Sequence, residues 1–141
     1  MPVTGRKAKP EGQAVNRHKP THDWTEVVDQ PFAGAPKLPK TQPNGMAWPS
    51  WTKRWWGVVS TMPHCTLWTD SDWEFAFDTA VLKAVFHMSS TNAMATEIRN
   101  REKVLGTTAD YRRDLRIRYV AAKVETEAPA EVTKLDDYRD L

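Results

Sequence analysis

Residues 67–90 constrain the fold more than any other part of the chain, because they predict one long helix with apolar side chains on two opposite faces. Thr69 and Asp72 have the spacing of a capping box, and Trp68 and Trp73 have the spacing of a hydrophobic staple. The wider face carries Trp73, Ala76, Phe77, Ala80, Val81, Ala84 and Met88. The opposite face carries Phe75, Leu82 and Phe86. Because a helix that is apolar on both sides is buried on both sides, we expect the second face to contact another copy of the chain.

A tryptophan-rich helix is predicted before this one. It begins at a Ser50 cap and ends before Pro63, since the residue before a proline resists the helical conformation. Its apolar face carries Trp51, Trp55, Val58, Val59 and Met62. Clustered tryptophans can stack on nucleic-acid bases, but this helical spacing favours packing in a core or between subunits.

Two helices are predicted after the long one, which gives an all-α fold with a core of about four helices. The third helix runs from about Thr91 to Leu105 and ends at Gly106. The fourth is capped by Thr107 or Thr108. Its apolar face carries Tyr111, Leu115, Tyr119 and Ala122.

The two ends of the chain differ from this core in composition. Eight of the ten prolines fall at or before Pro49, and residues 1–54 hold nine Lys and Arg against four Asp and Glu. From Lys123 onward there are three basic residues against six acidic ones. We therefore expect a flexible basic arm and linker over residues 1–47, a helical oligomerisation domain over 48–122, and an acidic tail over 123–141. Residues 31–47 fit either a linker or a strap that lies over a neighbouring surface.

The basic arm is a candidate for binding DNA, because each cation can neutralise a phosphate. A tail that only keeps the protein soluble is an equal alternative. The candidate DNA contacts are Arg6, Lys7, Lys9, Arg17 and Lys19 in the arm, with Lys53 and Arg54 off the apolar face of the first helix. In the acidic tail, apolar side chains recur every three residues and favour a short amphipathic helix on a partner: Val132, Leu135, Tyr138 and Leu141.

The sequence lacks the residue patterns of catalysis, so we expect no enzyme activity, no cofactor and no metal. His64 and Cys65 are adjacent, but a cysteine packed between helices explains them better than a nucleophile and its base. His18 and His22 have no further ligands to complete a metal site. No phosphate-binding loop is present. One cysteine, no run of eighteen apolar residues and no signal peptide predict a soluble intracellular protein without membrane contact.

The segment from Arg101 to Tyr119, REKVLGTTADYRRDLRIRY, resembles the C-terminal signature of phage terminase small subunits, in particular those of the P27-like group. That signature is a Leu-Gly-Leu/Thr-Thr-Pro-like turn followed by an arginine-rich helix. The matching positions are Leu105, Gly106, Thr107, Thr108, Arg112, Arg113 and Leu115. Ala109 departs from it, because the group often has proline there. The tryptophan-rich core and the basic N-terminus agree with the same group.

The resemblance implies the recognition subunit of a viral genome-packaging motor. Such subunits form homo-oligomeric rings, bind double-stranded viral DNA at the packaging-initiation sequence, and present it to the large subunit, which carries the ATPase and nuclease. They act in the host cytoplasm. It further implies that Arg112, Arg113 and Arg116 bridge subunits or line the pore, and that the acidic tail, through Leu135, Tyr138 and Leu141, binds the large subunit.

Two other functions remain open on the residues alone. A helical DNA-binding transcriptional regulator would use the same basic arm, but as a two-fold symmetric dimer. A structural adaptor would dock a partner through its tryptophan-rich surface and would show no salt-sensitive binding of DNA.

Overall fold

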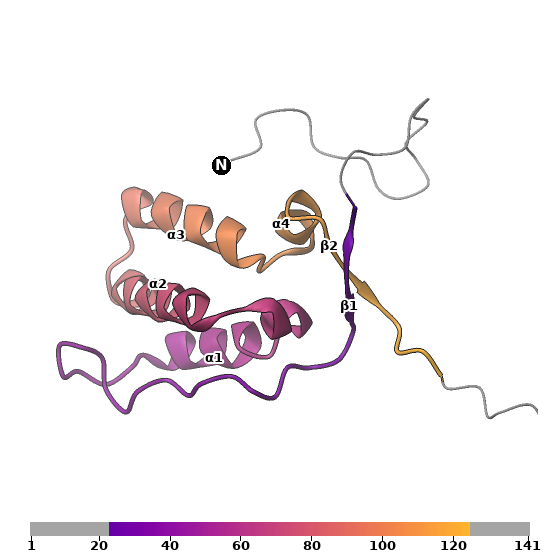
Figure 1. Cartoon of the computed structure of the whole chain (residues 1–141). Helices are drawn as coiled ribbons and strands as arrows, with labels where there is room; N and C mark the ends of the chain where they lie inside the picture. The colour runs from indigo at the N-terminus through magenta and orange to yellow at the C-terminus, as the bar shows by residue number, and fades with distance from the viewer. Residues whose placement is uncertain (1–22, 125–141) are drawn as a thin grey trace, which may run out of the picture.

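Three helices stack in chain order and form the body of the protein (Figure 1). They are α1 (Ser50–Val59), α2 (Asp70–Met88) and α3 (Asn92–Leu105), and α2 lies between the other two. A short 3₁₀ helix, η1 (Pro63–Leu67), joins α1 to α2. This computed structural model describes residues 23–124.

The start of α2 confirms the prediction from its sequence. The Asp72 carboxylate accepts a hydrogen bond of 2.8 Å from the backbone N–H of Thr69, which is part of the predicted capping box. The Trp68 and Trp73 rings meet edge to face with centroids 4.7 Å apart, as a hydrophobic staple requires. These local contacts fix where the longest helix begins.

The ends of α3 also lie where the sequence places them. The Thr91 side chain accepts a hydrogen bond from the backbone N–H of Met94 at the first turn. Gly106 ends the helix with φ 73°, a left-handed conformation that glycine adopts without steric cost.

The buried face of α1 differs from the predicted one. Thr52, Trp56 and Val59 are buried, whereas Trp51 and Val58 are more than 60% exposed, at 62% and 63%. Trp56 stacks on Phe77 of α2 with ring centroids 4.9 Å apart. The prediction is confirmed for Val59 and Met62, which are buried, and wrong for Trp51 and Val58. The buried face includes Thr52 instead, because α2 supplies a hydrogen-bond partner that allows a threonine to be buried.

Residues 31–47 form a strap across the helices of their own chain, the second of the two alternatives for this segment. The indole N–H of Trp48 donates to the Pro39 carbonyl at 2.9 Å, and that of Trp56 donates to the Pro36 carbonyl at 3.3 Å. Phe32 stacks on Trp73 with ring centroids 6.0 Å apart. The strap runs along the lower side of α1 in Figure 1 and closes the core from that side.

The fold is mostly helical but not all-α, which corrects the predicted class. The fourth helix, α4, covers only Ala109–Asp114, and the chain then turns at Arg116 with φ 59°. Residues 117–120 form a strand, β2 (Ile117–Val120), instead of continuing the helix to Ala122. The prediction was wrong because Ile, Tyr and Val favour strands, and this segment forms backbone hydrogen bonds with a strand that is distant in the sequence.

That partner is β1 (Thr25–Val28), which pairs with β2 in parallel and in the register Thr25 opposite Ile117. Val27 is buried on the face of the sheet that contacts η1. Side chains alternate along a strand, so Glu26 and Arg118 lie on the opposite face, where they form an ion pair. Among the described residues, η1 packs on one face of the sheet and the ion pair lies on the other. The two strands lie at the edge of the helical body (Figure 1).

Candidate nucleic-acid interface

The outer face of α1 presents an aromatic ring beside two cations. Trp51 is exposed, and the guanidinium carbon of Arg54 lies 5.5 Å from the centre of its ring. Lys53, which lies between these two residues in the sequence, is also exposed. Lysine and arginine contact phosphates, and an exposed ring can stack on a base. The structure thus places the predicted DNA contacts Lys53 and Arg54 next to a tryptophan that the sequence pattern had assigned to the core.

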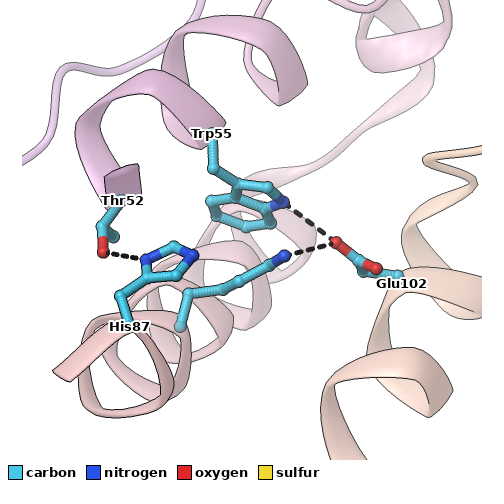
Figure 2. A network of polar contacts seen from close by, with 5 residues as sticks. Thr52, Trp55, His87 and Glu102 are labelled. Atoms are coloured by element: carbon cyan, nitrogen blue, oxygen red, sulfur yellow. Dashed lines mark hydrogen bonds and ion pairs between the residues drawn. The ribbon is translucent and has the colours of Figure 1, made fainter. Parts of the chain in front are cut away.

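A polar network behind this face holds the three helices together (Figure 2). Thr52 Oγ1 and His87 Nδ1 share a hydrogen bond of 2.8 Å between α1 and α2. The Trp55 indole N–H donates to Glu102 Oε1 at 3.0 Å, and the Lys83 ammonium lies 3.1 Å from the same oxygen. Burial, with a smaller contribution from Lys83, lowers the pKa of His87. The orientation of the outer face of α1 is therefore fixed by side chains from α2 and α3.

His64 forms a second junction, between η1, the end of α3 and β2. It is 1% exposed, and its Nε2 lies 2.7 Å from the Leu105 carbonyl while its Nδ1 lies 2.6 Å from the Tyr119 hydroxyl. Because a carbonyl only accepts, Nε2 donates to Leu105 and Nδ1 accepts from Tyr119. Burial, above all, lowers the pKa of His64, and the nearby charge of Arg112 lowers it further. Sequence reasoning missed this role, since a lone histidine has no distinguishing pattern.

The cysteine next to His64 is a packed core residue, as predicted. Cys65 is buried, and its thiol donates to the Val59 carbonyl at 3.2 Å. Burial raises the pKa of the thiol to about 12. A thiol in this environment stays protonated and is a poor nucleophile.

A groove of about 530 Å³ opens between the end of α1, the end of α3 and the start of α4. Its lining includes Trp55, Val58, Thr107, Arg112 and Tyr119. The Arg112 guanidinium lies over the Tyr119 ring at 4.8 Å and donates to the Gly106 carbonyl at 3.1 Å. The groove therefore has an apolar floor and one cation that the protein itself holds in place.

The other arginines of the run 112–118 lie on different elements. Arg113 pairs with Asp110 at 3.4 Å within α4, and Arg116 lies over the Trp24 ring at 5.6 Å. Arg118 belongs to β2. Arg112 and Arg113 belong to α4, whereas Arg116 lies beyond its end at Asp114, so the three arginines do not share one helix. Their role between subunits stays a prediction.

The predicted oligomer face of α2 is half-buried within the single chain. Phe75, Leu82 and Phe86 are all of intermediate exposure. The Arg101 guanidinium of α3 lies 5.5 Å from the Phe75 ring, so α3 covers part of this face. Contact of these side chains with another copy stays a prediction.

Several predicted residues lie outside the described part of the chain. They are Arg6, Lys7, Lys9, Arg17 and Lys19 of the basic arm, and Leu135, Tyr138 and Leu141 of the acidic tail. Within residues 23–124, no group of three or more His, Cys, Asp or Glu side chains could hold a metal ion. No helix in that range is long and apolar enough to cross a membrane.

Comparison with known proteins gave one finding that covers nearly the whole chain. A family model described as phage terminase small subunit matches residues 3–141. No curated protein and no solved structure gave a match.

Proposed function

Because the chain belongs to the phage terminase small subunit family, we propose that it recognises viral DNA at the packaging-initiation sequence and recruits the large terminase subunit. The match over residues 3–141 carries this proposal. It makes the chain a phage DNA-packaging subunit in general, from a family that associates with viral DNA and the large subunit. The turn Leu105–Thr108, followed by Arg112 and Arg113, supports assignment to the P27-like group within that family.

The described surface that best suits DNA is the outer face of α1. Within residues 23–124, Lys53 and Arg54 form no ion pair with an acidic side chain, and Trp51 adds a ring beside them. Contacts of this kind neutralise phosphates and so fix the position of the DNA, with affinity that falls as salt rises. In our proposal the basic residues 6–19 extend the same contact.

The protein acts in this proposal as a ring without catalytic activity, in the host cytoplasm. A closed assembly repeats the α1 face once per subunit, so that contacts that are weak singly become strong together. The acidic residues from Lys123 onward contact the large subunit, which supplies the ATP-driven chemistry. The raised pKa of Cys65 supports a role without catalysis, because it leaves the one thiol of the chain unreactive.

The test measures the affinity of the full chain for double-stranded viral DNA across a salt series, by fluorescence anisotropy. We expect the logarithm of the binding constant to fall linearly with the logarithm of salt concentration. The double variant Lys53→Ala with Arg54→Ala removes two cations from each subunit and should reduce the magnitude of that slope by about 2 for every subunit that contacts the DNA. Affinity should fall uniformly across DNA sequences, because these are phosphate contacts.

The matched control is Arg99→Ala with Lys103→Ala, which removes the same charge from exposed positions of α3. If both double variants change the slope equally, net charge and not the α1 face governs binding. Absence of salt-dependent binding to any viral DNA would contradict the recognition role itself.

A further inference from the structure

The sheet of β1 and β2 is incomplete as it stands in one chain. Within residues 23–124 it has two strands, which pair in parallel. Parallel sheets are normally covered on both faces, and sheets of two strands are marginally stable in water. Glu26, Val28 and Arg118 lie on the face turned away from η1, and among the described residues no helix packs on this face, where Val28 is 39% exposed.

The hydrogen bonds of the sheet show which backbone groups remain unpaired. Thr25 N–H donates to the Arg116 carbonyl and Asp29 N–H to the Val120 carbonyl, both at 2.8 Å. Backbone groups alternate in direction along a strand, so residues 26 and 28 of β1 point away from β2, and residues 117 and 119 of β2 point away from β1. The carbonyl of Val28 accepts from Gln30 N–H at 2.8 Å. The N–H of Glu26, Val28, Ile117 and Tyr119 has no acceptor among the described residues.

A groove of about 520 Å³ runs along the open edge of β1. Its lining includes Glu26, Val28, Pro31, Phe32 and Leu67. Leu67 is 48% exposed, so the groove offers apolar surface beside the unpaired backbone groups. An edge with unpaired N–H and C=O groups beside a groove that exposes apolar side chains is an arrangement that accepts an added strand.

We propose that the open edge of β1 binds the open edge of β2 from a second copy of this chain, in parallel and in the register that β1 and β2 already have within one chain. This register matches each unpaired group. The N–H groups of Glu26 and Val28 meet the carbonyls of Ile117 and Tyr119. The N–H groups of Ile117 and Tyr119 meet the carbonyls of Trp24 and Glu26. The one carbonyl that is already used, that of Val28, would face position 121, beyond the end of β2.

Charge favours the same pairing. Glu26 and Arg118 are opposite each other within the chain and form an ion pair on the face turned away from η1. In the proposed register the Arg118 of the neighbouring copy lies on the other side of Glu26. Each carboxylate is then flanked by two guanidinium groups, and no like charges are opposed across the added pair.

This contact joins two different surfaces of the chain, so each copy has one donor edge and one acceptor edge. Such a head-to-tail contact produces a ring when its rotation closes. The inference rests on the proposed function, because it assigns the surface through which the proposed ring assembles. It replaces the α2 face as the principal contact and leaves the α1 face outside the sheet.

Hydrogen–deuterium exchange at single-residue resolution, together with native mass spectrometry of the full chain, tests the pairing. In the oligomer, the amides of Glu26, Val28, Ile117 and Tyr119 should exchange at least about tenfold more slowly than in the separated chain. An oligomer in which these amides exchange at unprotected rates overturns the inference and leaves the proposed function intact. Absence of any oligomer overturns both the inference and the ring, whereas recognition of DNA is judged by the separate salt series.

Variants locate the contact independently. Val28→Lys places a charged side chain on the face of β1 beside the added strand, which disfavours pairing at an edge, and should give separated chains. Val104→Lys, at an exposed valine of α3, should leave the oligomer unchanged. Glu26→Arg should weaken assembly, and the added change Arg118→Glu should restore it. Circular dichroism checks that each variant is folded. An intact oligomer in folded Val28→Lys, or failure of the charge swap to restore assembly, would count against the proposed register.

Discussion

Replacement of Gly106 by alanine tests whether the junction at His64 stabilises the fold. Gly106 has φ 73°, and a Cβ atom placed on it would lie 3.0 Å from His64 Nε2 and 3.2 Å from Leu115 Cδ1. His64 Nε2 is the atom that donates to the Leu105 carbonyl. The substitution therefore strains the backbone and also pushes the imidazole away from its acceptor.

The two effects have separate magnitudes. The left-handed conformation costs an L-residue about 1–2 kcal/mol. Loss of a buried hydrogen bond that leaves its partners unsatisfied costs about 1–3 kcal/mol. We therefore expect Gly106→Ala to lower the free energy of unfolding by about 2–5 kcal/mol.

Gly45→Ala is the matched control, because Gly45 also has a positive φ of 81° but nothing lies within 4 Å of a Cβ placed there. It should lose only the conformational part, about 1–2 kcal/mol. Urea unfolding followed by tryptophan fluorescence measures both, with equal slopes expected. Equal losses for the two variants would show that the His64 junction contributes no stability, and would refute the reasoning.

Two further predictions concern neighbouring side chains. Burial holds the pKa of His64 below 6.5, so the unfolded chain binds a proton more readily than the folded chain. The free energy of unfolding is therefore highest above pH 6.5 and falls as the pH drops below that value. His64→Gln should flatten this dependence in urea titrations between about pH 5 and pH 8. Titration of His87, whose pKa is also lowered by burial, adds a dependence of the same sign that the variant retains. Thr107 Oγ1 is buried without a hydrogen-bond partner among the described residues, so Thr107→Val should leave the free energy of unfolding unchanged or raise it by up to about 2 kcal/mol. Thr108→Val removes the capping hydroxyl that accepts from the Tyr111 N–H and should lower the free energy of unfolding by about 1 kcal/mol. If thermal unfolding shows Thr107→Val to be less stable than Thr108→Val, both predictions are contradicted.

Helix ends were predictable because their causes lie within a few residues of each other. Asp72 reaches back to Thr69, Trp68 meets Trp73, and Gly106 stops α3 where the apolar spacing ends. Each of these contacts forms inside one or two helical turns. No knowledge of the remaining chain was needed to place them.

The errors concern residues whose environment comes from distant segments. Thr52 is buried because His87, thirty-five residues later, shares a hydrogen bond with it. Ile117–Val120 become a strand because residues 25–28 supply the other half of the ladder. Four residues are too few for alternation to outweigh the helical spacing of Tyr111, Leu115 and Tyr119.

For the candidate DNA-binding surface, the sequence identified the two cations but not the exposed aromatic ring beside them. Lys53 and Arg54 were named from their charge and position, whereas exposure of Trp51 depended on which face α1 buries. The open strand edges could not be predicted at all, since they follow from the pairing of two segments that the sequence assigned to a linker and a helix.

The pairing of β1 with β2 also sets the order in which the chain can fold during synthesis. Glu26 and Arg118 are separated by 92 positions, and every helix of the body lies between them. At a translation rate of about 5–20 residues per second, β1 leaves the ribosome about 5–20 s before its partner strand exists. The helices, whose contacts are mostly local, can pack during that interval, and closure of the sheet is left as the last and slowest step.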